Sequence, residues 1–173
     1  MLDLVGLFLE YRADIQRLAL VAVAGAALRW GAGPERSTGL ALLYLLLADI
    51  FYHLVFGPGV ALGHIDVGHA FIDLSALGLM GAIALFANRM YTLWIGALQM
   101  IAVLAHVARD LETGIAPLVY AIMFIAPSYV QIALLAGGTW AHRKRRSRFG
   151  KYSSWRTSST LSWVSVRLAW LSV

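Results

Sequence analysis

Acidic and histidine residues recur four positions apart in two apolar stretches of the chain. Asp49 and His53 form the first pair, and His69 and Asp73 form the second pair in reverse order. Residues at this spacing share one face of a helix and lie within hydrogen-bonding reach. A carboxylate beside an imidazole can orient a metal-bound histidine, and it can also pass a proton, because histidine titrates near neutral pH. The spacing therefore predicts metal or proton chemistry on helices.

The helices that must carry these residues are expected to meet at one side of a membrane. The segment 38–56 ends where the segment 67–87 begins, and the segment 90–109 ends on the same side with His106. We therefore expect one cluster in the outer half of the membrane, made of His53, His69, His106, Asp49, Asp73, His64 and Asp66. In the inner half we expect no comparable group, and the polar residues there are Tyr91, Thr92 and Gln99.

Several kinds of chemistry fit such a cluster. Neutral imidazoles and carboxylates bind zinc and other divalent metals. Acid–histidine pairs relay protons in proton-coupled carriers. Two histidines on facing helices, for example His53 and His106, can hold a b-type haem near a quinone site. The acid–histidine spacing fits a metal or a proton relay better than haem, and the same pairs can also serve only to join helices.

The sequence offers no motif for an enzyme. It has no HExxH, GxSxG or P-loop pattern, and these are the patterns that mark metalloproteases, hydrolases and nucleotide-binding proteins. It also has no cysteine, which excludes disulfides, thiolate metal sites and cysteine nucleophiles.

The composition is that of an integral membrane protein. Of the 173 residues, 60% are hydrophobic and only 13% are charged, whereas soluble domains carry about 25% charged residues. We expect an all-α, polytopic membrane bundle over residues 1–141, with five transmembrane helices, or four if the first does not span. The predicted helices are 11–31, 38–56, 67–87, 90–109 and 115–138. We expect a turn at RWGAGPER (29–36), because Pro34 should prevent a helix from continuing, and a cap at Ser37 or Thr38.

The charge is concentrated near the C-terminus. Eight of the fourteen Lys and Arg residues follow Trp140, and the positive-inside rule makes the tail 142–173 cytoplasmic. Basic residues beside a membrane helix contact anionic lipid headgroups rather than nucleic acid. The expected contacts are Arg143, Lys144, Arg145, Arg146 and Arg148. The segment 152–173 is either an interfacial helix with tryptophans at headgroup depth or an atypical, unstructured end.

Three stretches carry a resemblance to other proteins: RWGAGPER, NRMYTLW and PSYVQIALLAGGTWAHRKR. Over about residues 18–156 the chain resembles uncharacterised small multi-pass inner-membrane proteins of alphaproteobacteria. The resemblance implies an inner-membrane location and transfers no functional residue.

The function we expect is therefore that of an inner-membrane protein whose outer His/Asp cluster handles protons or a cation. One alternative is a structural subunit or anchor that packs against partner membrane proteins or further copies of itself and holds a cofactor. Another is a metal-dependent membrane enzyme. The sequence does not identify the cofactor, and it favours a divalent metal over haem.

Overall fold

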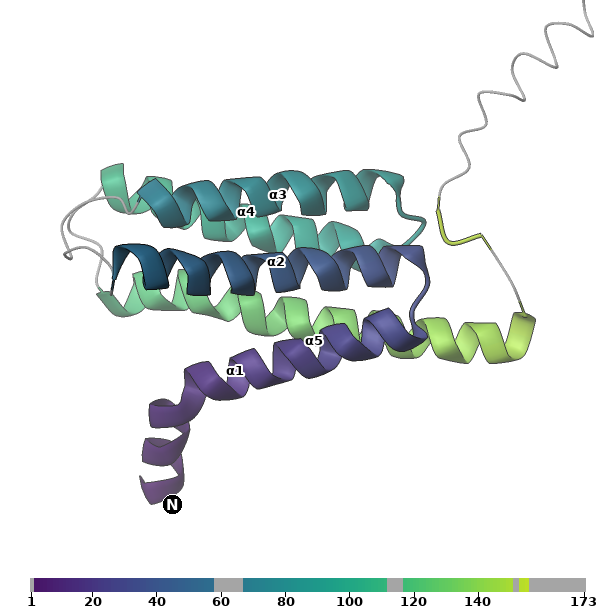
Figure 1. Cartoon of the computed structure of the whole chain (residues 1–173), viewed down its shortest axis with the longest axis horizontal. Helices are drawn as coiled ribbons and strands as arrows, with labels where there is room; N and C mark the ends of the chain where they lie inside the picture. Colours follow the sequence, from purple (N-terminus) through teal and green to yellow (C-terminus); the bar gives the residue numbers. More distant parts are fainter. Residues whose placement is uncertain (1, 58–66, 112–116, 151–152, 156–173) are drawn as a thin grey trace, which may run out of the picture.

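The computed structural model describes residues 2–57, 67–111, 117–150 and 153–155. Over these residues the protein is all-helical, with five helices. They are α1 (Leu2–Trp30), α2 (Gly33–Phe56), α3 (Val67–Phe86), α4 (Met90–Leu111) and α5 (Pro117–Phe149). Helices α2 to α5 run alternately in opposite directions along the bundle, and α1 crosses it obliquely (Figure 1).

The two ends of the bundle carry different side chains. Asp49 and His53 of α2 and His69 of α3 lie towards the end where α2 stops and α3 starts, which we call the His/Asp end. The Lys- and Arg-rich part of α5 lies at the opposite end, next to the turn between α1 and α2, which we call the basic end (Figure 1).

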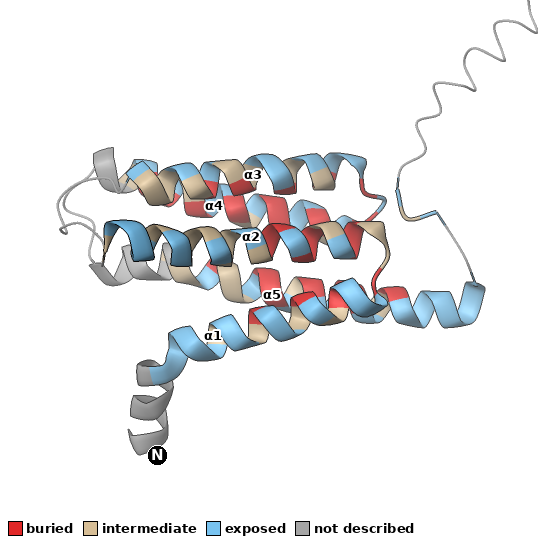
Figure 2. Ribbon diagram, in the orientation of Figure 1, coloured by how far each residue is buried: buried red, intermediate tan, exposed pale blue. Residues whose placement is uncertain are grey.

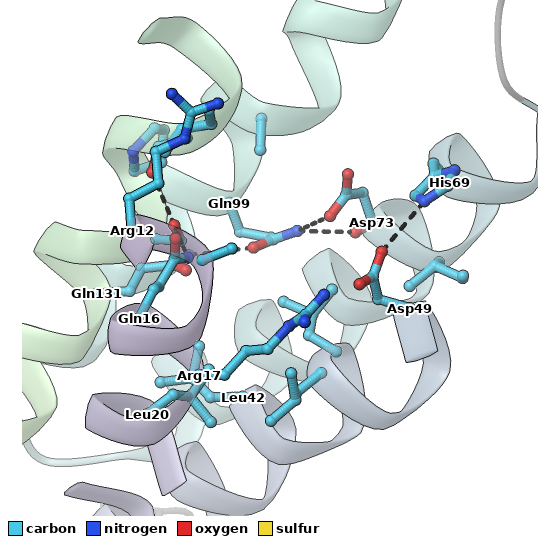
Figure 3. Close-up of a pocket in the computed structure, with 18 of the residues that line it drawn as sticks. Arg12, Gln16, Arg17, Leu20, Leu42, Asp49, His69, Asp73, Gln99 and Gln131 are labelled. Carbon is cyan, nitrogen blue, oxygen red and sulfur yellow. Dashed lines mark hydrogen bonds and ion pairs between the residues drawn. The ribbon is translucent and has the colours of Figure 1, made fainter. Parts of the chain in front are cut away.

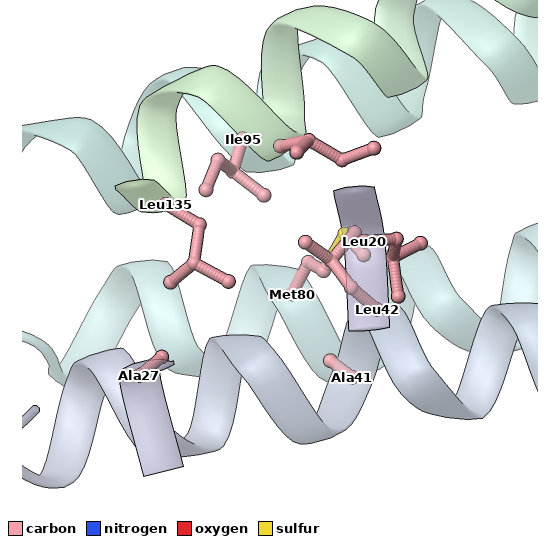
Figure 4. Close-up of a cluster of buried hydrophobic side chains, with 8 residues drawn as sticks. Leu20, Ala27, Ala41, Leu42, Met80, Ile95 and Leu135 are labelled. Atoms are coloured by element: carbon pink, nitrogen blue, oxygen red, sulfur yellow. The ribbon is translucent and has the colours of Figure 1, made fainter. Parts of the chain in front are cut away.

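The helices form a ring around a small apolar core. Each helix packs against its neighbours in the chain, and α5 closes the ring by packing on α1 and also on α2. All five helices contribute buried apolar side chains (Figure 4), which are Leu20, Ala27, Ala41, Leu42, Met80, Ile95, Ile132 and Leu135.

The outer surface of the bundle is also apolar. Large side chains on α2, α3 and α4 point outward, with Leu54 81%, Phe71 70% and Trp94 62% exposed (Figure 2). A helix that is apolar on its outer face as well as its inner one is typical of lipid surroundings. Within the described residues, three helices are long and apolar enough to cross a membrane: α2, α3 and the part of α4 up to residue 108. The fold therefore supports the predicted membrane bundle.

The start of α2 differs from the prediction. The turn is shorter than residues 29–36, and the predicted cap at Ser37 or Thr38 is wrong, because α2 begins before them. Pro34 lies in the first helical turn, where its missing N–H would have had no intrahelical partner. The Glu35 carboxylate accepts a hydrogen bond of 3.0 Å from the backbone N–H of the residue that precedes the helix. Glu35 therefore caps α2.

The end of α5 also differs from the prediction. The helix continues beyond the expected range 115–138 and through the basic run, because Lys and Arg are good helix formers. It stops at Gly150, whose φ of 72° is a conformation that glycine adopts at little cost. Residues 153–155 return to the bundle, where the N–H of Asn88 donates to the carbonyl of Ser154 at 3.2 Å.

Gly31 lies in the turn between α1 and α2, where there is no room for a side chain. A Cβ atom there would press against the Ala27 carbonyl and the Glu35 side chain. We expect Gly31→Ala to cost about 1–3 kcal/mol, as overpacking does, and to lower the thermal unfolding midpoint in detergent. Gly25→Ala is the control, because a Cβ there meets nothing within 4 Å. Equal midpoints for the two variants would contradict the tight turn.

Candidate functional site

Three side chains of the metal-ligating types meet between α2 and α3 at the His/Asp end. The Oδ1 atom of Asp49 lies 3.1 Å from Nε2 of His69 and 3.7 Å from Nδ1 of His53. One ligand atom from each residue can be chosen so that all lie within 4.8 Å of one another. We call these three residues the Asp49 group. One turn of α2 places Asp49 beside His53, and the packing of α3 on α2 adds His69 (Figure 3).

Aromatic contacts and a backbone bond hold the two imidazoles in place. The ring centroid of His69 lies 4.9 Å from that of His53 and 4.6 Å from that of Tyr52, with both ring pairs close to edge-on. The Tyr52 ring packs on Gly68 so closely that a Cβ there would collide with it. Nδ1 of His53 is 3.0 Å from the carbonyl oxygen of Asp49. The rings are therefore held beside the carboxylate by α2 and α3 together.

A second acid–histidine pair lies deeper in the bundle, between α3 and α4. Oδ2 of Asp73 is 2.8 Å from Nε2 of His106, and both residues are buried. The Gln99 amide donates to Oδ1 of Asp73 at 2.9 Å, and the Gln131 amide donates to Gln99 at 3.0 Å. These bonds join α3, α4 and α5 and satisfy polar groups that would be costly to bury alone. Gln99, which we expected away from the cluster, is part of it.

A cavity of about 610 Å³ connects the Asp49 group to the buried pair. Its walls come from all five helices, and the lining combines Leu, Ile and Ala with a similar number of polar and charged residues. The carboxylates of Asp49 and Asp73 and the side chains of Arg12 and Arg17 of α1 all line it (Figure 3). The cavity can therefore bring a small polar or charged ligand to both acid–histidine pairs.

The structure divides the sequence-predicted residues into three sets. Three of them form the Asp49 group at the cavity wall. Asp73 and His106 form the buried pair, of which Asp73 lines the cavity. His64 and Asp66 lie outside the described residues. The five described residues of this prediction thus occupy two neighbouring positions, one partly open and one buried.

Arg17 lines the same cavity as the Asp49 group, and we expect its positive charge to weaken the binding of cations there. Its side chain is 51% exposed and also lies 3.6 Å from Asp14. We expect Arg17→Gln to raise the affinity for Zn²⁺ about fivefold at low salt, because nearby like charges repel by about 1 kcal/mol in water. Zinc titration of the protein in detergent measures this, with Arg148→Gln at the basic end as the control. The gain should shrink at high salt. Identical affinities for the two variants would contradict this role of Arg17.

A buried polar cluster at the basic end was not predicted. Nε of Arg89 donates to the fully buried Glu35 carboxylate at 3.3 Å. Tyr91 lies beside this carboxylate and also beside Thr38. His142 is buried at the same end, and its burial is the main cause that lowers its pKa. The expectation that the inner half holds no comparable polar group is therefore wrong. The sequence signal was the pair of opposite charges, Glu35 and Arg89, each next to a turn.

Comparison with known proteins adds no assignment to this geometry. No protein-family model, no curated protein and no solved structure matches the chain. The resemblance to small multi-pass inner-membrane proteins therefore stays a prediction. What the site can do follows from its own distances, burial and charges.

Proposed function

We propose that the protein is an integral protein of the bacterial inner membrane with five spans and a cytoplasmic C-terminus. The lengths and hydropathies of α2, α3 and α4 support a membrane location. In this proposal α1 and the apolar part of α5 also span, and the basic end faces the cytoplasm, as the positive-inside rule requires. The residues that would then contact anionic lipid are Arg143, Lys144, Arg145, Arg146 and Arg148.

Within that topology, the proposed function is to take up a cation from the outer side at the Asp49 group. The observation that carries it is a carboxylate held between two imidazoles at the wall of a cavity, with ligand atoms within 4.8 Å of one another. Two neutral imidazoles and one carboxylate form a ligand set that Zn²⁺ and similar divalent metals use, with a further position left for water. Shifts of about 1 Å in these side chains would bring the ligand atoms to coordinating distances of about 2.0–2.2 Å from a metal.

The buried pair of Asp73 and His106 lies next to the proposed cation site and could couple cation entry to the movement of a proton. Asp73 faces the cavity and binds His106 behind it. Acid–histidine pairs inside membrane proteins can relay protons, so this pair offers a route for a proton when a cation enters the cavity. A titratable pair next to the proposed entry site supports proton or cation transport over simple binding.

A flux assay in liposomes tests this proposal. The purified protein is reconstituted with a zinc-sensitive dye or a pH-sensitive dye inside the vesicles. We expect zinc entry with the wild type and its loss in Asp49→Ala, whereas Asp73→Asn should bind zinc but lose the coupled proton signal. Tyr44→Phe is the control, because it removes only a hydroxyl that contacts Ser75. Wild-type flux equal to that of empty liposomes would contradict transport.

A metal-dependent membrane enzyme is the second candidate. The observation that favours it is the partial exposure of the Asp49 group, with the side chains of His53 44% and Asp49 38% exposed. Catalytic zinc sites hold three protein ligands and keep one position open for water or substrate. Zinc binding without zinc flux, together with zinc-dependent hydrolysis of a test substrate, would favour this candidate.

A further inference from the structure

A second hollow lies at the basic end, far from the Asp49 group along the bundle. It encloses about 360 Å³ between the end of α1, the start of α2 and the last turns of α5. Its chemistry is that of guanidinium groups, one indole and one hydroxyl. The side chains that line it are Arg29, Trp30, Arg36, Arg143, Arg146 and Ser147.

The hollow has a strong positive charge that no carboxylate among its described lining residues balances. Four arginines line it, and no carboxylate does among the described residues. At this end of the bundle the described carboxylate is Glu35, which is completely buried and occupied by Arg89. Four cations drawn together without a counter-charge repel one another. An anion in the hollow would remove that repulsion.

The fold holds these arginines in place. Arg143 and Arg146 are three residues apart on α5 and therefore lie on one face of the helix, and the guanidinium of Arg143 stacks 5.0 Å from the ring of Trp30. The tight turn at Gly31 brings α1 and α2 together, so that Arg29 and Arg36 reach the same hollow. Three separate helices thus contribute to one site, unlike a general basic surface on α5 alone.

We propose that this hollow binds a phosphate group, and that the group belongs to the headgroup of an anionic phospholipid. Guanidinium groups bind phosphate oxygens through paired, charge-assisted hydrogen bonds. The hollow lies where α1 and α2 reach the end of the bundle, beside the half-exposed Trp30. Tryptophans are enriched at the depth of lipid headgroups. Basic hollows between helices at the cytoplasmic surface are typical sites for such lipids. The assignment of the phosphate group to a lipid rests on the proposed membrane placement. The binding of a phosphate group by these arginines does not depend on that placement.

Lipid binding can be tested with a charge-matched pair of double variants. Arg36→Gln with Arg146→Gln removes two charges from the hollow, whereas Lys144→Gln with Arg148→Gln removes two exposed charges of α5 that do not line it. Each protein is placed in phosphatidylcholine nanodiscs that contain increasing amounts of phosphatidylglycerol. The rise in its thermal unfolding midpoint, relative to the same protein without phosphatidylglycerol, measures the affinity. We expect the first variant to lose affinity for phosphatidylglycerol at least about tenfold. The second removes only general contacts with anionic lipid at the surface of α5, so we expect it to lose much less affinity.

Each outcome decides between the sources of the phosphate group. Equal losses in the two double variants would overturn the site and leave only general surface charge. Stabilisation by inorganic phosphate, with no response to phosphatidylglycerol, would overturn the lipid assignment. Zinc binding at the Asp49 group should be unchanged in both variants, so a failure of the lipid site and a failure of the cation site are seen separately.

Discussion

Replacing Asp49 with alanine is expected to abolish high-affinity zinc binding. In the proposed site Asp49 would supply the anionic ligand, and its carboxylate lies 3.1 Å from Nε2 of His69. Losing an outer partner of a metal ligand already costs about 10- to 100-fold in affinity. Because Asp49 would be a direct ligand as well, we expect a loss of at least about 100-fold. Isothermal titration of the protein in detergent measures the affinity.

The control for this experiment is Tyr44→Phe on the same helix. Tyr44 bonds to Ser75 across the contact between α2 and α3 and lies outside the Asp49 group, so its loss tests damage to helix packing alone. We expect wild-type zinc affinity for this variant. A similar loss in Tyr44→Phe, or unchanged affinity in Asp49→Ala, would show that the carboxylate is not a ligand.

Replacing Arg89 with alanine is expected to be the most destabilising single change at the basic end. Glu35 is completely buried and binds the Arg89 guanidinium at 3.3 Å, so the variant would leave a buried carboxylate without its counter-charge. Breaking a buried ion pair in this way costs about 3–5 kcal/mol. Denaturant unfolding in mixed micelles, followed by circular dichroism, measures the free energy of unfolding.

Two further variants separate the ion pair from the loss of an arginine in general. Arg36→Ala removes an exposed arginine from the same end and should change the unfolding free energy by no more than about 0.5 kcal/mol. The double variant Arg89→Ala with Glu35→Gln should recover part of the loss, because a neutral amide is less costly to bury than a carboxylate. If Arg89→Ala and Arg36→Ala have equal free energies of unfolding, the ion pair of Glu35 and Arg89 does not stabilise the fold.

The sequence predicts the three middle helices well, because their signal is local, whereas α1 begins at Leu2 and not at the predicted residue 11. Apolar runs between polar turns located α2, α3 and α4 to within a few residues, except at the start of α2. The error there came from Pro34, which both stops a helix and fits its first turn. The basic run of α5 was predicted as a tail because its charges marked a membrane surface, although Lys and Arg also extend a helix. Charge decides position in a membrane, and it does not by itself end a helix.

The partners within the site could be predicted only in part. The four-residue spacing placed Asp49 beside His53 on one face of α2, and the structure agrees. The contacts of Asp49 with His69 and of Asp73 with His106 cross between helices. Such contacts depend on how each helix is rotated about its axis, and one sequence does not give that rotation. The ion pair between Glu35 and Arg89, which are 54 residues apart, was not predicted for the same reason.

The most direct test of the account is anomalous diffraction from crystals of the protein grown with zinc. We predict a single strong zinc peak between the carboxylate of Asp49 and the rings of His53 and His69, at about 2.0–2.2 Å from each ligand atom. A zinc peak elsewhere in the protein, or none at this position while the three side chains keep their places, would contradict the proposed cation site.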